Sequence, residues 1–455
     1  MPSRYPLFMN KTDKIALIGY GVEGQAVASY LYAQDYKDVT ILDDKEVTPK
    51  EPYLAVCGKN AMSHLMNFDI AFRTPGVSLL RPELVEAAEH GVKITSQTEL
   101  FLELCRGITI GVTGTKGKTT TSTFLHHLLT AAGKKSVLVG NVGIQMLSQL
   151  SEIDEETYVI MELSSFQLHD LPTSPHIAMV LGITPEHLDY HKDFDEYVEA
   201  KSSIVIHQGI SDIKIVDVDN EISRAFENIG SAQAYQVSKK EPVSYGIGVQ
   251  DEHVIFCEDG EYEALVDLKD IPAKAPELRI NFLMGLTLGY ILGITKEVMR
   301  DALLSYKGVP YRMEFVRKVG EVSFWNDSAG TTPESAMAAI HSFSEPMMLL
   351  LGGGEKNVAF EGLVDELFRS SHLRKVVTIG EKAGRRLYDV IEARGETPFG
   401  LKHVKDFSSL PKIFAEVVAS SEIKHVVLSP ACSSLDQFQN YKERGDLFVR
   451  MVGEL

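Results

Sequence analysis

Short apolar runs rich in β-branched residues alternate with longer amphipathic runs along this chain. The first apolar run, at 15–18, is followed by a glycine turn, a helical pattern to about residue 33 and a second apolar run at 39–42. Apolar runs of this length, bounded by turn residues, predict strands, and the longer pattern between them predicts a helix. Strand, helix and strand within about thirty residues form the βαβ unit of a parallel sheet.

The pattern restarts at two further places, and the strands predicted there share one property. Each ends beside Gly, Ser or Asp, as expected of strand ends that face a common cleft. A separate region, at 213–271, is richer in strands and loops than the rest of the chain. The predicted strands of the later parts are 109–112, 322–326, 348–351, 376–379 and 426–428.

We therefore predict an α/β fold with three domains in series. No repeat, low-complexity tract or long Pro- or Ser-rich linker interrupts the sequence, so the connections are expected to be short. The predicted domains are a Rossmann-like domain over 1–105, a central domain with a mostly parallel sheet over 106–309, and a Rossmann-like domain over 310–455.

Composition and charge narrow the class of protein. Lys and Arg number 45 against 63 Asp and Glu, a net charge of −18, which argues against general binding to nucleic acid or to anionic membranes. This net charge does not exclude the binding of an anionic small molecule in one locally positive cleft. The four cysteines are far apart, which excludes a disulfide scaffold and a cysteine-based zinc site. Without a signal-peptide core or a long apolar run, we expect a cytoplasmic protein with no membrane insertion.

The strongest local motif lies between a predicted strand and a predicted helix. Its glycines let backbone N–H groups point at phosphate oxygens, and the helix N-terminus adds partial positive charge. Lys118 is spaced to reach the terminal phosphates of a nucleotide and Thr119 to bind Mg²⁺. Val112 stands where the generic motif has Gly, and a turn with a surface lysine is the alternative; we predict a nucleoside triphosphate site. The motif reads Gly111-Val112-Thr113-Gly114-Thr115-Lys116-Gly117-Lys118-Thr119-Thr120.

A second glycine motif follows the first predicted strand. It has the GxGxxG spacing, and Asp43 ends the next strand about twenty residues later. This is the dinucleotide-binding fingerprint, which by itself suggests NAD and a dehydrogenase. Such a turn serves any nucleotide diphosphate, because it binds pyrophosphate, and it can also be a tight turn with nothing bound. The motif reads Gly19-Tyr20-Gly21-Val22-Glu23-Gly24.

Together with further strings, the triphosphate motif resembles the Mur ligases of peptidoglycan synthesis. The resemblance extends over essentially the whole chain and keeps the family's order and approximate spacing. It is strongest to the branch that adds D-glutamate to UDP-N-acetylmuramoyl-L-alanine. The strings are GVTGTKGKTT at 111–120, GNVG at 140–143, MELSSFQL at 161–168, TPEHLD at 184–189, YRME at 311–314, NDS at 326–328, LGG at 351–353 and SPACSSLDQF at 429–438.

The resemblance implies an ATP-dependent carboxylate–amine ligase that works through an acyl phosphate. A UDP-binding N-terminal domain, a central P-loop ATPase domain and a C-terminal amino-acid domain would form a monomer. Two Mg²⁺ ions would be held by Thr119, Glu162, His187 and a carbamylated Lys201. Catalytic roles would fall to Lys118, Glu162, His187 and Lys201.

The resemblance also implies three groups of binding residues. For ATP they are Gly114, Thr115, Lys116, Gly117, Lys118, Thr119, Thr120, Asn281, Tyr311, Arg312 and Asp327. For the UDP-linked substrate they are Gly21, Val22, Glu23, Asp43, Gly76, Asn141 and His187. For the amino acid they are Thr331, Lys356, Ser434, Leu435 and Tyr441.

Two positions depart from the family pattern. After Asp327-Ser328 the family carries a lysine, where this chain has Ala329, and the second Asn of an N-x-x-N helix start is Met284. Three alternatives therefore stay open: a ligase for another amino acid or acceptor (for example a folylpolyglutamate-type ligase using L-glutamate), a catalytically silent relative, and the dehydrogenase.

Overall fold

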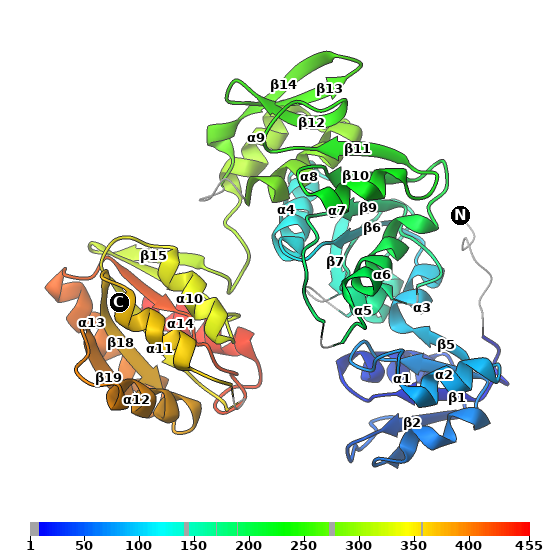
Figure 1. Cartoon of the computed structure of the whole chain (residues 1–455), viewed down its shortest axis with the longest axis horizontal. Coiled ribbons are helices and arrows are strands. Elements are labelled where there is room, and N and C mark those ends of the chain that lie inside the picture. The colour runs from blue at the N-terminus through cyan, green and yellow to red at the C-terminus, as the bar shows by residue number, and fades with distance from the viewer. Residues whose placement is uncertain (1–8, 141–144, 170, 189, 273–277, 356–357) are drawn as a thin grey trace. The chain divides into compact units, whose positions relative to one another are not determined.

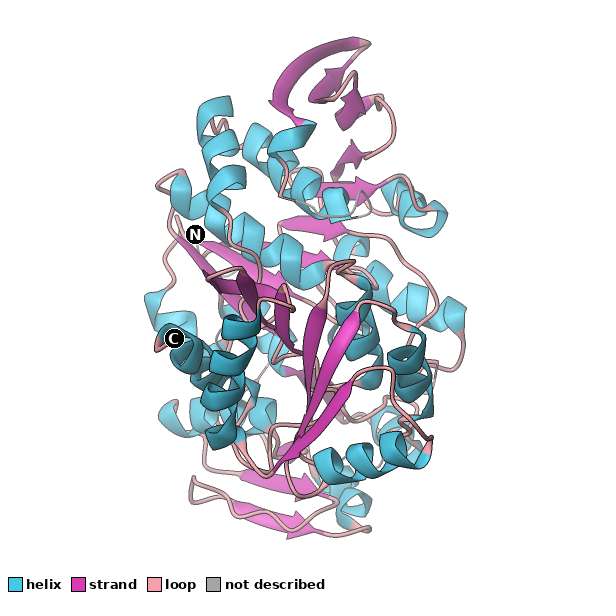
Figure 2. Cartoon of the chain, turned by 90° about the vertical axis from the view of Figure 1, so that its left-hand side faces the viewer, coloured by secondary structure: helices cyan, strands magenta, loops and turns pink. Residues whose placement is uncertain are grey.

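The computed structural model describes residues 9–140, 145–169, 171–188, 190–272, 278–355 and 358–455. The chain divides into two compact units, residues 1–306 and 307–455, and each is described by itself. Both have α/β architecture with mostly parallel sheets, which confirms the predicted fold class (Figures 1 and 2). Among the described residues, no helix is long and apolar enough to cross a membrane.

The first sheet of unit 1–306 has five parallel strands in the order β3-β2-β1-β4-β5. Every residue of the central strand β1 is buried. The chain order reverses at β1, and such a switch point leaves a crevice at the carboxyl ends of the strands. The strands are β1 (Ile15–Ile18), β2 (Val39–Asp43), β3 (Leu54–Cys57), β4 (Ile70–Arg73) and β5 (Lys93–Ser96); the helices are α1 (Val22–Ala33), α2 (Pro82–Glu89), α3 (Gln97–Leu104) and the 3₁₀ helix η1 (Ala61–Asn67).

The second sheet of this unit has nine strands in the order β14-β13-β12-β11-β10-β9-β6-β8-β7. It is parallel from β7 to β12 and antiparallel from β12 to β14. The region predicted to be rich in strands supplies β10 to β14, which include the antiparallel end. The strands are β6 (Ile108–Thr113), β7 (Ser136–Gly140), β8 (Tyr158–Glu162), β9 (Ile177–Val180), β10 (Ile213–Asp217), β11 (Gln233–Val237), β12 (Tyr245–Gln250), β13 (His253–Glu258) and β14 (Glu261–Asp267).

Helices cover this sheet and connect its parallel strands. One hydrophobic cluster contains residues of both sheets, including Leu17 of β1 and Val159 of β8, so the two sheets share buried apolar contacts. The helices are α4 (Lys118–Ala131), α5 (Ser165–Leu168), α6 (Phe194–Ile206), α7 (Glu221–Arg224), α8 (Arg279–Ile291), α9 (Lys296–Ser305) and the 3₁₀ helices η2 (Leu147–Glu152), η3 (Ala225–Asn228) and η4 (Leu268–Asp270).

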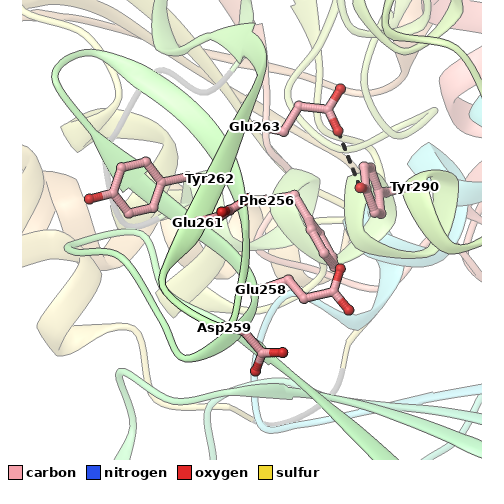
Figure 3. A pocket seen from close by; sticks show the side chains of 7 residues that line it. All are labelled: Phe256, Glu258, Asp259, Glu261, Tyr262, Glu263 and Tyr290. Atoms are coloured by element: carbon pink, nitrogen blue, oxygen red, sulfur yellow. Dashed lines mark hydrogen bonds between the residues drawn. The ribbon is translucent and has the colours of Figure 1, made fainter.

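A pocket lies at the antiparallel end of the nine-stranded sheet (Figure 3). The rings of Phe256 and Tyr290 stack with centroids 3.8 Å apart, and the Tyr290 hydroxyl donates a hydrogen bond to Glu263 at 3.2 Å. The remaining lining is acidic apart from Tyr262. None of the residues predicted for the functional site lines this pocket.

Unit 307–455 contains a six-stranded sheet in the order β15-β16-β20-β17-β18-β19. Only the edge pair β15–β16 is antiparallel. The strands are β15 (Glu314–Val319), β16 (Val322–Asn326), β17 (Met347–Gly352), β18 (Leu373–Ile379), β19 (Gly400–Val404) and β20 (His425–Leu428); the helices are α10 (Pro333–His341), α11 (Glu361–Arg369), α12 (Ala383–Ala393), α13 (Leu410–Ser420), α14 (Tyr441–Gly453) and the 3₁₀ helix η6 (Phe407–Ser409).

Alternate residues of β17 bury against different helices, because side chains of a strand point to opposite faces. Leu349 belongs to a cluster with α10, α11 and α12, whereas Leu350 belongs to a cluster with α13 and α14. The only tryptophan of the chain, Trp325, lies on β16, and its indole N–H donates to Nδ1 of His425 at 3.1 Å. This unit therefore has its own two-sided core.

The three sheets span 15–96, 108–267 and 314–428. The division into three domains at 105/106 and 309/310 stays a prediction.

Candidate active site

The phosphate loop runs from the end of β6 to the start of α4. Val112, which replaces the expected glycine, is a strand residue paired with Glu162 of β8, so the loop itself begins at Gly114. Gly114 and Gly117 have φ angles of 149° and 87°, which disfavour other residues. A Cβ on Gly117 would also lie 2.2 Å from Oδ1 of Asn281. Asn281, which was predicted to contact ATP, therefore packs directly against Gly117 of this loop.

Thr115 fastens the loop to the segment that follows β9. Its N–H donates to the carbonyl of Gly182 at 2.9 Å, and its hydroxyl donates to the carbonyl of Thr184 at 3.0 Å. That segment continues to Glu186, which lies 3.6 Å from the ammonium group of Lys116. The Lys116 side chain is 87% exposed, so this contact with Glu186 is a surface ion pair.

Two lysines meet at the loop. Nζ of Lys118 donates to the carbonyls of Gly114 and Thr115, both at 2.9 Å. Nζ of Lys201, on α6, donates to the same Gly114 carbonyl at 3.1 Å and to Thr113 Oγ1 at 3.3 Å. Lys201 is buried, and burial, with a smaller effect of the Lys118 charge, lowers its pKa to about 7. A large fraction of this amine is therefore neutral near pH 7.

Glu162 is buried at the carboxyl end of β8, next to β6 in the sheet. The chain then turns at Ser164, which caps α5 together with Gln167. His187 has a positive φ of 57°, is half exposed, and its ring packs on Phe166 with centroids 4.9 Å apart. Thr119 and Thr120 are half-buried in the first turn of α4.

The glycine motif of the first sheet adopts the geometry that its spacing predicts. Gly19 has φ 87°, and a Cβ on Gly24 would lie 2.0 Å from the Gly19 carbonyl oxygen. Gly21 faces open space, which permits close approach of a ligand to the backbone. Asp43 accepts a hydrogen bond from the N–H of Tyr20 at 2.8 Å, which fastens the turn to β2. Val22 and Gly76, the latter in the turn after β4, are exposed.

Glu23, predicted to contact the UDP-linked substrate, is directed toward the second sheet. Its Oε1 accepts from the side-chain amide of Gln167 at 3.0 Å, and burial raises its pKa. Arg73, at the end of β4, is 2% exposed and donates to the carbonyls of Val77 and Phe166, both at 2.9 Å. It also donates to the Tyr190 hydroxyl at 3.1 Å. Sequence reasoning missed Arg73, although a charged residue ending an apolar strand is a signal that could have found it.

In unit 307–455, the residues predicted for the nucleotide lie at the carboxyl end of β16. Asp327 is buried, accepts from the Ser429 hydroxyl at 2.6 Å, and burial raises its pKa to about 6. Tyr311 has φ 61°, and its hydroxyl donates to Asp446 at 2.8 Å. Arg312 is exposed.

The residues predicted for the amino acid lie near the same strand ends. The Ser328 hydroxyl donates to the carbonyl of Tyr441 at 2.7 Å, and the rings of Tyr311 and Tyr441 meet edge to face. Ser434 is buried, whereas Leu435 is 72% exposed and Thr331 is half-buried.

Arg444, which was not predicted, is 1% exposed and donates to the carbonyl and hydroxyl of Ser328 and to the carbonyls of Cys432 and Ser433. It therefore supplies a cation next to the loop in which Ala329 replaces the family lysine. Asn141 and Lys356 lie outside the described residues.

The chain matches two protein-family models and is similar to several solved structures. Residues 13–96 match the Mur ligase MurD-like N-terminal domain, and residues 112–268 match the Mur ligase middle domain. Among solved structures, the chain is similar to the UDP-N-acetylmuramate–alanine ligase of Thermotoga maritima, with a TM-score of 0.55 and 17% identity over 97% of this chain and 99% of that one. It is also similar to the MurF ligase of Thermotoga maritima in complex with ADP, with a TM-score of 0.51 and 17% identity over 97% and 94%. These two likenesses show the fold.

Two curated relatives are similar over nearly their full length. The UDP-N-acetylmuramoylalanine–D-glutamate ligase of Acetivibrio thermocellus is 33% identical over 98% of this chain and 97% of the relative. The ligase of the same name from Clostridium kluyveri is 32% identical over 98% and 97%. The dehydrogenase interpretation of the first glycine motif is therefore wrong. At this identity and coverage, the chain belongs to the Mur ligase family of ATP-dependent ligases.

Proposed function

We propose that this protein adds D-glutamate to UDP-N-acetylmuramoyl-L-alanine in an ATP-dependent reaction, as a cytoplasmic monomer. One observation carries the proposal: Lys118 and Lys201 both donate to the carbonyl oxygen of Gly114. This oxygen belongs to a phosphate loop that lies beside the strand ending in Glu162. Such an arrangement suits the transfer of a phosphoryl group, which depends mainly on positioning and charge neutralisation. The names of the relatives from Acetivibrio and Clostridium support the choice of substrates.

The reaction needs activation because a carboxylate does not react with an amine at neutral pH. A substrate carboxylate oxygen attacks the γ-phosphorus of ATP, ADP leaves, and an acyl phosphate forms. The amine of D-glutamate then attacks the acyl carbon, and inorganic phosphate leaves. In this proposal Lys118 neutralises charge on the transferred group, and the backbone N–H groups from Gly114 to Thr120 hold the ATP phosphates.

Mg²⁺ fits the donor atoms beside the loop. The hydroxyl of Thr119 and the carboxylate of Glu162 are hard oxygen ligands, which this ion prefers, and they would hold a first ion. His187 and a carbamate on Lys201 would hold a second. Bound there, the ions would supply positive charge to the phosphate oxygens.

The UDP-linked substrate is assigned to the first sheet. The open backbone at Gly21 and the nearby exposed positions Val22 and Gly76 favour a pyrophosphate at this turn, with Asp43 shaping it from β2. Glu23 would act indirectly, because its carboxylate is already bound to Gln167. Asn141 and His187 would face the muramoyl part.

Unit 307–455 is assigned the amino acid and part of the nucleotide. The hydroxyl groups of Thr331, Ser434 and Tyr441, with Lys356 and the loop at Leu435, would recognise the two carboxylates of glutamate. Tyr311, Arg312 and Asp327 would contact the adenosine and the γ-phosphate.

The lowered pKa of Lys201 supports the carbamate. A neutral amine reacts with CO₂, whereas the ammonium form does not, and a cation at this place would repel Mg²⁺. We expect Lys201→Ala to be nearly inactive and excess formate or acetate, but not chloride, to restore part of the activity by supplying the missing anion. If Lys201→Ala keeps most of its activity in CO₂-depleted buffer, the carbamate is wrong.

The main test is ADP release by the purified full chain with ATP, Mg²⁺ and UDP-N-acetylmuramoyl-L-alanine. D-Glutamate is expected to be the preferred amino acid over L-glutamate, lysine and diaminopimelate, and Lys118→Ala should lower the rate far more than tenfold. Absence of ADP release with every amino acid would indicate a silent relative.

Ala329, which removes the family lysine, favours a second candidate: a ligase for a different amino acid or acceptor. Faster ADP release with L-glutamate, or with a folate acceptor, would establish it.

A further inference from the structure

Two histidines and a glutamate come together where α5 and α6 pack side by side (Figure 1). His169 follows α5, His191 lies in the loop before α6, and Glu196 is in the first turn of α6. One potential ligand atom of each lies within 4.8 Å of the other two. This cluster contains none of the residues assigned to Mg²⁺, ATP or the two substrates.

The three side chains are held in defined positions. Nε2 of His169 lies 2.9 Å from Oε1 of Glu196. The second oxygen of Glu196 accepts from the N–H of Lys192, which leaves Oε1 directed at the histidine. Nε2 of His191 is paired with the hydroxyl of Ser165 at 2.9 Å.

The surroundings of His191 indicate that this cluster binds a ligand. Its side chain is 3% exposed, and its ring packs against Phe166 and Tyr197 at centroid distances of 5.7 and 5.4 Å. Within the described part of the chain, its Nδ1 is buried and has no hydrogen-bond partner. A buried nitrogen without a partner costs about 1–3 kcal/mol, unless an ion or water bonds to it.

The donor set selects the class of ion. Two imidazole nitrogens and one carboxylate oxygen suit Zn²⁺ and its neighbours in the transition series, whereas Mg²⁺ and Ca²⁺ prefer oxygen alone. The 2.9 Å between His169 and Glu196 is compatible with two ligands at about 2.0–2.2 Å from one ion. Both side chains are 14% exposed, so an ion can reach them from solvent.

We propose that His169, His191 and Glu196 form a site for one Zn²⁺-like transition-metal ion, with a fourth position open to water. A bound ion replaces the direct contact between His169 and Glu196 and links the end of α5 to the start of α6. Because β8 and its Glu162 precede α5 and Lys201 lies on α6, this link joins two elements of the candidate active site.

The proposal is tested by titrating the full chain with Co²⁺, a spectroscopic substitute for Zn²⁺, in excess Mg²⁺. We expect one Co²⁺ per chain, visible by its d–d absorption and displaced by Zn²⁺. His169→Gln and Glu196→Gln should each weaken Co²⁺ binding at least tenfold, and Zn²⁺ should raise the Tm of the parent chain but not of these variants.

His341→Ala is the matched control. His341 and Glu366 form the same pair at 2.8 Å, and no group of three potential ligands is found there among the described residues. Co²⁺ binding should therefore be unchanged in this variant. Unchanged binding in both His169→Gln and Glu196→Gln, or loss of binding only in Glu162→Gln, would overturn the proposal. His169 and Glu196 are partly exposed, so their variants test the site without any substitution of the buried His191.

Discussion

Lys201 shows how one buried position changes the chemistry of a common residue. Its amine is surrounded by the loop carbonyl of Gly114, the hydroxyl of Thr113 and the ring of Tyr197, whose centroid lies 4.8 Å away. Burial removes water from the ammonium form, and this effect outweighs the favourable charge of Glu186, so the neutral form is favoured. The lysine is therefore suited to react as a nucleophile.

This lowered pKa predicts a pH dependence of stability. Between pH about 7 and the ordinary lysine value of about 10.4, the unfolded chain binds one more proton at this site than the folded chain. The free energy of unfolding should therefore rise with pH across this window, by up to about 1.4 kcal/mol per pH unit, and level off above it.

Lys201→Met should remove that slope. The measurement is urea unfolding in CO₂-free buffers from pH 7 to pH 10. Lys405→Met, at an exposed position, is the control and should keep the slope of the parent chain. Equal slopes in the parent and in Lys201→Met would show that the amine is not buried in solution.

At the scale of elements, the phosphate loop depends on contacts that each of its ends makes. Thr115 bonds to the segment after β9, and Gly117 packs against Asn281 of α8. The loop is therefore held by two segments, the loop after β9 and helix α8, that lie far apart in the sequence.

Two glycines at opposite ends of α4 allow a matched test of this loop. Gly117 and Gly133 both have positive φ, 87° and 70°, but a Cβ on Gly133 would meet open space. Gly133→Ala should cost about 1–2 kcal/mol of stability and leave nucleotide binding unchanged. Gly117→Ala should weaken ATP binding more than tenfold, because the loop must move away from Asn281. Calorimetric titration with ATP distinguishes the two, and equal ATP affinities would contradict the packing argument.

Arg73 contributes polar contacts between the first sheet of unit 1–306 and the segments that follow β8 and β9. Arg73→Met leaves Glu23 buried without its nearby cation and removes the hydrogen bond to the Phe166 carbonyl. The bond from the Tyr190 hydroxyl to the Val77 carbonyl stays in place. Loss of one partner from such a buried group costs about 3–5 kcal/mol, which urea unfolding should detect.

Arg81→Met is the control for this prediction. Arg81 pairs with Asp44 and Glu83 at the surface, so its loss should cost less than about 1 kcal/mol. A similar small loss for Arg73→Met would mean that water reaches the guanidinium.

At the scale of the molecule, unit 1–306 has two sheets and unit 307–455 has one, and each unit has its own apolar clusters. Residues 307–455 should therefore fold alone and unfold cooperatively, as should residues 1–306. Neither fragment should release ADP by itself, because the residues proposed for phosphate transfer and for the amino acid lie on different units. Circular dichroism of the purified fragments checks the folding, and a disordered 307–455 fragment would contradict this division.

Much of the parallel core could be predicted from the sequence. The strands at 15–18 and 322–326 have the predicted bounds, and β6 differs from the predicted strand at 109–112 by one residue at each end, because apolar runs between turn residues determine them. The edge strand β15 was missed, since half of its residues are exposed and its pattern is polar.

The burial of charged residues in the candidate site depends on contacts between distant segments. A lysine on a helix, such as Lys201, is normally solvated, and only the packing of α6 against the loop buries it. In the same way, no local pattern shows that Arg444 lies under the Ser328 loop. For both residues, side-chain burial is a property of the folded chain and cannot be read from their neighbours in sequence.

Trp325 gives the intact chain a built-in optical reporter. Because it is the only tryptophan and lies on β16, indole fluorescence observes residues 307–455 alone, whereas circular dichroism observes the helices of both units. Its surroundings, the Phe343 ring at 5.3 Å and the imidazole of His425, change as this unit unfolds. Where the fluorescence and dichroism curves diverge along a denaturant series, their separation measures the difference in stability between the two units without cutting the chain.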